Sequence, residues 1–128
     1  MFLLDTHVAL WLIGQPDRVP LAVREALAEP TSPLLVSAIS ALEVATKVRN
    51  GRLHLPGVVE SWHHRVGDIG ATELAVTAEH ALLAGSMAWH QSDPFDRTLV
   101  SQAIIEGATF VTVDREIVGL PAPRVLTW

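Results

Sequence analysis

Three short apolar runs constrain the fold of this chain more than any other feature. They are Met1–Leu4, Leu34–Val36 and Thr109–Val113, and none of them strictly alternates apolar with polar residues. A strand with one face in water alternates apolar with polar residues. A strand of a parallel sheet that is covered on both faces is apolar throughout. Helical patterns separate the runs. The sequence therefore predicts an α/β fold in which helices cover both faces of a parallel sheet.

Local signals place the remaining elements. Pro20 opens one helical pattern and Gly51 follows the end of another, which is typical of helix starts and ends. We expect helices over residues 6–13, 20–28, 39–50, 58–66, 77–89, 95–106 and 115–118. We also expect a last strand over residues 124–126 and an extended or irregular segment over residues 69–74. No repeat or linker interrupts this order, so residues 1–128 are interpreted as a single domain.

The composition excludes several classes of protein. Apolar residues make up 49% of the chain and charged residues 18%, which is incompatible with intrinsic disorder. Cysteine is absent, which excludes a disulfide scaffold, a thiolate zinc site and a cysteine nucleophile. The start lacks the basic region of a signal peptide, and no apolar run approaches the ~18 residues of a membrane span. We expect a soluble, cytoplasmic protein with no membrane partner.

Single acids embedded in apolar sequence are the first functional signal. They occur in four segments, which are Leu3–Thr6, Ser40–Glu43, Asp93–Asp96 and Thr112–Asp114. Asp5 and Asp114 end predicted strands, and α/β sheets bind ligands beyond the carboxyl ends of their strands. Mg²⁺ and Mn²⁺ prefer carboxylate oxygens, and two such ions roughly 4 Å apart activate water for displacement at a phosphodiester. The acids therefore predict a site for hard divalent ions.

Each of these acids also has a structural interpretation. Three of them directly precede a predicted helix, where an acid is a typical N-cap: Asp5, Asp93 and Asp114. Glu43 completes a capping box with Ser40, or forms a helix-surface pair with Lys47 four residues later. Asp96 complements the helix dipole in a first turn. The convergence of all these acids at one end of one sheet is what favours the metal interpretation.

Several segments resemble the motifs of one family, in the same order along the chain. They are Leu3–His7 with Leu10–Trp11, Ser37–Glu43 with Lys47, Gly51 and Leu53–Pro56, Trp89–Arg97, and Thr112–Asp114. Together they resemble PIN-domain proteins of the VapC toxin type over nearly the whole chain, and Trp89–Arg97 is the most specific match. Val113 departs from the pattern, since many members carry a polar residue at this position.

The resemblance implies a PIN-like three-layer α/β/α sandwich with a central, mostly parallel sheet of four or five strands. It also implies an endoribonuclease that depends on one or two Mg²⁺ or Mn²⁺ ions. The implied catalytic and metal-binding residues are Asp5, Glu43, Asp96 and Asp114, with Asp93 as an additional candidate. Members of the family are usually toxins that a small, VapB-like antitoxin holds inactive, and they commonly form homodimers. We expect Thr6 and Thr112 to orient carboxylates by hydrogen bonds.

The charge of the chain bears on an RNA substrate. Nine Lys and Arg against fourteen Asp and Glu give a net charge of −5, which by itself argues against phosphate binding. Two divalent ions would add four charges and bring the total to about −1. The candidate RNA contacts are Lys47, Arg49, Arg52 and Arg97. The first three are alternatively a solvated helix end, and Arg97 alternatively pairs with Asp93 or Glu116.

Other chemistries find less support in the sequence. No histidine pair has the H-x-x-x-H spacing of a zinc site, so His7 and His90 are interpreted as packing residues or as residues that orient ligands. No glycine-rich nucleotide loop and no G-x-S-x-G nucleophile elbow occurs. We expect Trp11 and Trp89 in the core and Trp62 on a partner surface.

Two alternative functions stay open at this point. One is a catalytically inactive PIN-fold module that only binds a partner, although all four acids are present. The other is a metal-dependent phosphohydrolase, which would carry a D-x-D pair where this chain has Asp5–His7.

Overall fold

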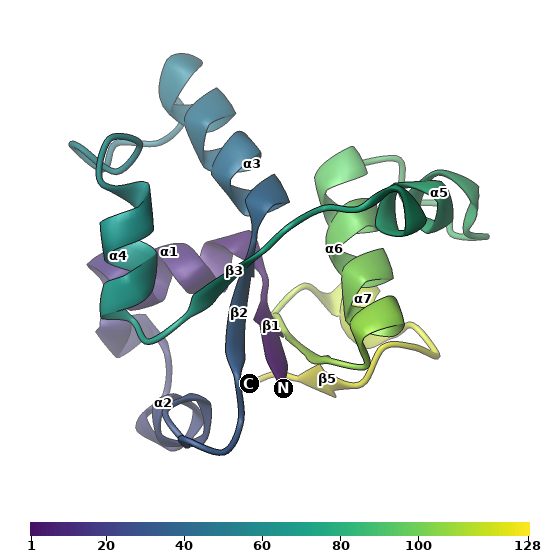
Figure 1. The fold of residues 1–128 in the computed structure, drawn as a ribbon, viewed down its shortest axis with the longest axis horizontal. Helices are drawn as coiled ribbons and strands as arrows, with labels where there is room; N and C mark the ends of the chain where they lie inside the picture. Colours follow the sequence, from purple (N-terminus) through teal and green to yellow (C-terminus); the bar gives the residue numbers. More distant parts are fainter.

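All five strands of the chain lie in one sheet, and every neighbouring pair is parallel (Figure 1). The computed structural model describes residues 1–128. In the spatial order β3-β2-β1-β4-β5, the strands are Thr72–Leu74, Leu34–Ser37, Phe2–Leu4, Thr109–Val111 and Val125–Leu126. The prediction of a parallel sheet is confirmed, and the segment 69–74 supplies one of its two edge strands.

Seven α-helices and one 3-10 helix cover the two faces of this sheet. They are α1 (Thr6–Gly14), η1 (Pro16–Arg18), α2 (Leu21–Leu27), α3 (Ala38–Arg49), α4 (Trp62–Asp68), α5 (Ala78–Ser86), α6 (Pro94–Glu106) and α7 (Arg115–Val118). Helices α1 to α4 lie on one side of the sheet and α5 to α7 on the other (Figure 1). This is the expected three-layer arrangement. None of the helices combines the length and the apolar character that a membrane crossing requires.

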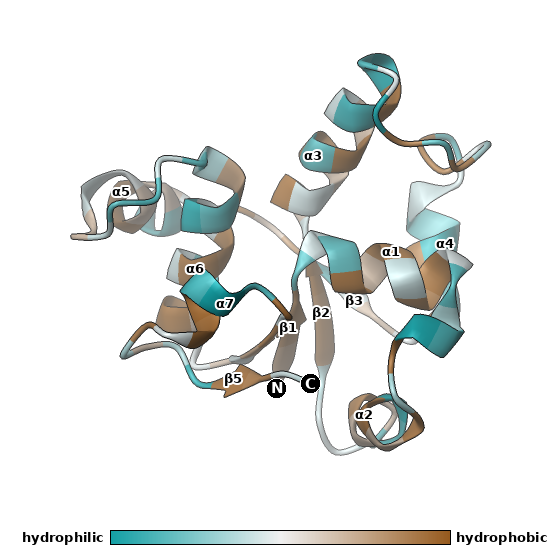
Figure 2. Ribbon diagram, turned by 180° about the vertical axis from the view of Figure 1, so that it is seen from behind, coloured by the Kyte–Doolittle hydropathy of each residue, from teal (hydrophilic) through white to brown (hydrophobic).

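Successive residues of the central strands point into two different cores, which explains why these strands do not alternate in sequence. In β1, Leu3 packs into a core formed with α6 and α7, whereas Leu4 packs into a larger core formed with α1 to α4. In β4, Phe110 and Val111 divide between the same two cores. All four side chains are fully buried. Figure 2 shows the resulting distribution, with apolar strands at the centre and polar residues on the outer helical surfaces.

Two helix boundaries differ from the sequence prediction by more than two residues. The helix expected over residues 58–66 begins only at Trp62, after turns that include Gly57 with a φ of +74°. The helix expected to reach residue 89 ends at Ser86, because Met87 has an extended backbone. Trp62 is also buried, and its indole N–H donates to Glu73 Oε1 at 3.0 Å. The prediction that Trp62 lies on a partner surface is therefore wrong.

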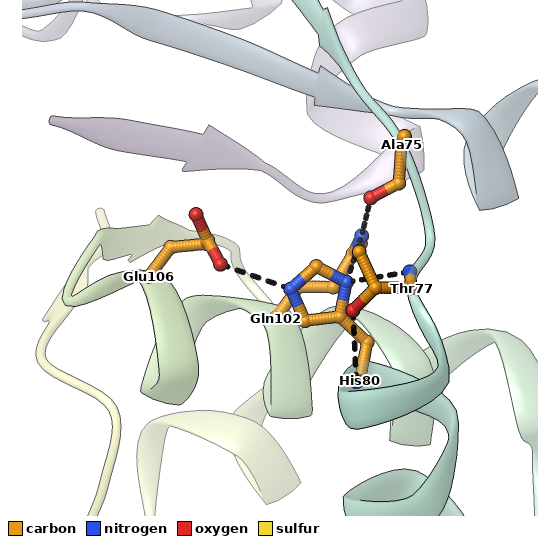
Figure 3. Close-up of polar contacts among 5 residues, drawn as sticks. All are labelled: Ala75, Thr77, His80, Gln102 and Glu106. Carbon is orange, nitrogen blue, oxygen red and sulfur yellow. Dashed lines mark hydrogen bonds and ion pairs between the residues drawn. The ribbon is translucent and has the colours of Figure 1, made fainter.

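A buried polar network fastens the segment between β3 and α5 to helix α6 (Figure 3). His80 Nδ1 accepts the backbone N–H of Thr77 at 3.0 Å, so this nitrogen carries no proton. Nε2 therefore carries it and donates to Glu106 Oε2 at 3.0 Å. Gln102 Nε2 donates to the carbonyl of Ala75 at 3.2 Å. Since His80 is only 2% exposed, these bonds replace water that the ring has lost.

We expect His80→Ala to lower the free energy of unfolding by about 3 kcal/mol, because it removes a helix cap, leaves Glu106 without its partner and opens a cavity. Urea unfolding at pH 7 measures the change. His64→Ala is the control, since His64 is 79% exposed and contacts Asp68 at the surface. The control is expected to change stability by less than about 0.5 kcal/mol. Equal losses in the two variants would contradict a stabilising role for the buried network.

Candidate metal centre

The order of the strands brings Asp5 and Asp114 to the same edge of the sheet. Asp5 directly follows β1, and Asp114 comes three residues after the neighbouring strand β4. The Thr112 hydroxyl joins them: it donates to Asp5 Oδ2 at 2.6 Å, and its oxygen accepts the Asp114 N–H at 3.0 Å. Thr112 is fully buried, so water does not compete for these bonds. The prediction that Thr112 orients a carboxylate is confirmed.

Glu43 reaches the same edge from the other neighbour of β1. Helix α3 begins at the carboxyl end of β2, with Ser37 as its N-cap, and places Glu43 on its second turn. The Glu43 side chain is buried, and its Oε2 lies 2.7 Å from Lys47 Nζ. The predicted pair with Lys47 is confirmed. The alternative of a capping box is wrong, because Ser40 lies inside the helix rather than at its start.

The hydroxyl of Thr6 has a partner other than a carboxylate. It lies 2.8 Å from Ser40 Oγ, and both side chains are fully buried. This bond ties the first residue of α1 to helix α3. The Thr6 hydroxyl therefore orients no carboxylate, and the hydrogen bond of Thr6 that acts on the pKa of Asp5 comes from its backbone.

Helix α6 contributes Asp93 and Asp96. Asp93 is its N-cap, with Oδ1 accepting the N–H groups of Phe95 at 2.8 Å and Asp96 at 3.5 Å. The capping role predicted for Asp93 is confirmed. Asp96 lies in the first turn, and no hydrogen bond within the chain engages its carboxylate. Asp96 is thus the acid of this group whose oxygens are left open to a ligand.

Arg97 has a structural role. Four of its N–H groups donate to the carbonyls of Ala84, Met87, Trp89 and Gln91, at 2.6 to 2.7 Å. These bonds hold the loop between α5 and α6 and explain why α5 stops where it does. The prediction that Arg97 contacts RNA is wrong, since its donors are directed at the protein backbone. It also forms no ion pair, so the predicted pairing with a carboxylate is wrong as well.

The electrostatics of Asp96 show that the acids converge. Burial and, after it, the charges of Asp93, Asp5, Asp114 and Glu43 together raise the pKa of Asp96 to about 7. Burial also raises the pKa of Asp5, partly opposed by the hydrogen bond from Thr112 and by the nearby His7. The carboxylates are therefore close enough to repel one another, as the sequence analysis expected.

The donor set suits a hard divalent cation. It consists of carboxylate oxygens, and a bound cation would relieve the repulsion that raises these pKa values. As the side chains stand, no three of the His, Asp and Glu residues form a group that could enclose an ion. Glu43 is engaged by Lys47, and Asp114 Oδ1 accepts the N–H of Glu116 as an N-cap. Asp5 occupies the N-cap position of α1, as the alternative interpretation predicted, but its carboxylate makes no capping hydrogen bond.

The remaining basic candidates lie near the end of α3. Lys47 is partly buried against Glu43, whereas Arg49 and Arg52 are exposed and have no carboxylate partner. His90 Nε2 lies 3.7 Å from Glu116 Oε1 at the surface. Sequence reasoning overlooked the role of Ser40 as the partner of Thr6, because the two are 34 residues apart and no local pattern connects them.

The raised pKa of Asp96 makes stability depend on pH. Between its unfolded value of 3.8 and about 7, the folded protein keeps a proton that the unfolded chain releases. Stability therefore falls as the pH rises through this window. Since Asn carries no charge, we expect Asp96→Asn to be more stable than the wild type at pH 8 in chelator, by on the order of 1 kcal/mol. The advantage should shrink below pH 5.

Thermal unfolding of both proteins at pH 5 and pH 8 measures this difference as a shift of several degrees in Tm. Glu79→Gln is the matched control, because Glu79 is an exposed acid in the first turn of α5. A stabilisation of Asp96→Asn that is equal at both pH values would contradict the assignment to a buried, crowded carboxyl group.

Known proteins share both the sequence and the fold of this chain. A model of the PIN domain matches residues 2–121. Ribonuclease VapC22 of Mycobacterium tuberculosis is 34% identical over 129 aligned positions, which cover 98% of this chain and 95% of the relative. Among solved structures, DNA-bound VapBC of Salmonella typhimurium matches with a TM-score of 0.69 and 21% identity, covering 99% of this chain and 97% of the other. VapBC2 of Rickettsia felis, bound to a DNA fragment from its promoter, matches with a TM-score of 0.68 and 17% identity, covering 99% and 98%. The chain belongs to the PIN-domain family and, within it, to the VapC group.

Proposed function

We propose that this protein is an endoribonuclease that depends on divalent cations and serves as the toxin of a toxin–antitoxin pair. The observation that carries the proposal is the crowding of acids around Asp96, whose pKa rises to about 7 at the carboxyl edge of the sheet. The 34% identity to a relative named as a ribonuclease supports RNA as the substrate. The whole chain, residues 1–128, would act as a single PIN domain.

We assign the ligand roles to the side chains that meet at this edge. Asp5, Asp96 and Asp114 would hold one or two Mg²⁺ or Mn²⁺ ions, and Glu43 would complete the set by turning from Lys47. When bound, such ions supply positive charge that activates water for in-line attack on phosphorus and stabilises the leaving oxygen. Asp93 caps α6 and adds negative charge next to Asp96.

The other side chains position these acids. Thr112 holds Asp5 in place through its hydroxyl and supports the turn that carries Asp114. The Thr6–Ser40 bond sets α1 against α3. No protein nucleophile is required, because the attacking group is water. Arg49 and Arg52, which have no carboxylate partner, remain candidates for contact with RNA phosphates.

The partners follow by analogy with the two similar structures, which are VapBC assemblies bound to DNA. A small, VapB-like antitoxin would bind this chain and hold it inactive, and two copies of the chain would form a homodimer. An inactive binding module is the second candidate function. It is less favoured, since a module without catalysis has no need to bury Asp5 and Asp96 among like charges.

The test of catalysis is a titration of Mg²⁺ and Mn²⁺ against cleavage of a total RNA pool. We expect cleavage that chelator abolishes, and a fall of at least about 100-fold in initial rate for Asp96→Asn. Glu79→Gln should retain the wild-type rate. Full metal-dependent activity in a folded Asp96→Asn protein would remove Asp96 from the ligand set. No cleavage at any ion concentration would favour the binding module.

Thr112→Val tests the positioning role of the hydroxyl. The substitution keeps the shape of the side chain and removes both hydrogen bonds, so Asp5 is less well oriented. We expect the ion concentration for half-maximal cleavage to rise about tenfold, while the rate at saturating ion falls less. Thermal unfolding would separate this effect from a general loss of stability. An unchanged ion dependence would assign Thr112 to packing alone.

A further inference from the structure

A hollow of about 250 Å³ lies beside the metal centre, outside the group of acids. Its walls come from the outer face of α1, the 3-10 helix η1 and the loop after α3. The residues that decide its chemistry are His7, Trp11, Arg18 and His54, and leucines of α1 and of the loop complete the lining. None of these residues is a proposed metal ligand, and only His7 acts on the acids, through its effect on the pKa of Asp5.

The charge in this hollow is opposite to that of the molecule. The chain has fourteen Asp and Glu residues and a net charge of −5, yet no acid lines the hollow. Its ionisable residues are one arginine and two histidines. Arg18 forms no ion pair, and its only side-chain hydrogen bond is a long one, 3.5 Å, to Gln15 Oε1. The hollow is therefore complementary to an anion.

The guanidinium of Arg18 lies over an aromatic ring, that of Trp11. The Arg18 guanidinium carbon lies 4.6 Å from the centre of the Trp11 ring. Trp11 is itself braced by Trp128, with ring centroids 6.3 Å apart and a tilt of 59°. A guanidinium that stacks on an aromatic ring presents its second face and its remaining donors outward. Nucleobases stack on both aromatic rings and guanidinium planes.

The hollow also lies at the right place relative to the acids. His7 comes two residues after Asp5, in the first turn of α1. His7, Trp11 and Gly14 follow one face of the helix, so at 1.5 Å per residue the hollow extends about 10 Å along α1 from His7. A chain that enters the hollow at His7 is thus continuous with a phosphate bound near Asp5.

We propose that this hollow is a nucleotide subsite for single-stranded RNA, next to the bond that is cut. The Arg18–Trp11 stack takes a base, and Arg18 or His54 contacts the adjoining phosphate. The assignment rests on the proposed function for its substrate class. It adds a binding determinant for that substrate which lies outside the acid cluster.

The experiment measures binding without cleavage. A fluorescently labelled single-stranded RNA is titrated with full-length Asp96→Asn protein in Mg²⁺, followed by anisotropy. Adding Arg18→Gln is expected to raise Kd about tenfold and to lower the slope of log Kd against log salt by about 0.7. Arg18→Lys keeps the positive charge but lacks the planar guanidinium that stacks on a base. Its affinity for the RNA should therefore lie between those of the parent and of Arg18→Gln. His54→Gln should raise Kd severalfold.

Arg124→Gln is the matched control, because Arg124 is exposed and precedes β5 at the opposite, amino edge of the sheet. It should change Kd by less than about twofold, apart from a small general effect of charge. Equal affinities of the Arg18→Gln and parent proteins would overturn the subsite. That result is also the one expected if a partner protein, instead of RNA, fills the hollow.

The outcomes separate this proposal from the nuclease proposal. If the wild type cleaves RNA with metal and Arg18→Gln binds RNA like its parent, the subsite is wrong and the nuclease assignment stands. If no ion supports cleavage but Arg18→Gln weakens binding relative to Arg124→Gln, the subsite stands and the nuclease assignment is wrong.

Discussion

Mutual repulsion among buried carboxyl groups is the constraint around which this structure is organised. Asp5, Glu43 and Asp96 share one edge of the sheet, where burial and like charge both oppose ionisation. Two short connections hold Asp5 against this repulsion: the residue directly follows the buried end of β1, and its carboxylate accepts a hydrogen bond from Thr112, which follows the neighbouring strand β4. The repulsion thus lowers the free energy of unfolding at the edge that would bind cations. A bound cation would restore that free energy.

The rest of the molecule holds helix α6 in register with that edge. At its first turn Arg97 binds one carbonyl of α5 and three of the loop that follows α5. Farther along, Gln102 and His80 join the helix to the end of β3 and the start of α5. Both anchors use buried or partly buried polar groups with little access to water, so each bond is strengthened by its surroundings. Asp96, next to Arg97 in the first turn of α6, therefore has little freedom to move away from the other acids.

The sequence alone was sufficient to predict the parallel sheet and the position of Asp5 and Asp114 at its carboxyl edge, because both follow from local patterns of residues. Strands apolar on both faces predict a covered parallel sheet, and an acid after such a strand must lie at its carboxyl edge. The roles of Thr6, Trp62 and Arg97 depend on residues 34, 11 and up to 13 positions away, and no local pattern reports such contacts. The cap at Asp93 was predictable from Asp93-Pro94, and the same carboxylate also raises the pKa of Asp96.

Net charge is a poor guide to what this surface attracts. The chain carries −5, and five of its fourteen acids gather at one edge, while the hollow along α1 contains only Arg18 and histidines as ionisable groups. Both features are positioned by the same helix: its first residue follows Asp5, and its outer face carries Trp11. The separation between the acids and the hollow is therefore set by the rise of an α-helix, which neither loop motion nor ionic strength alters. A substrate strand that spans the two would be held in one register by the backbone of α1.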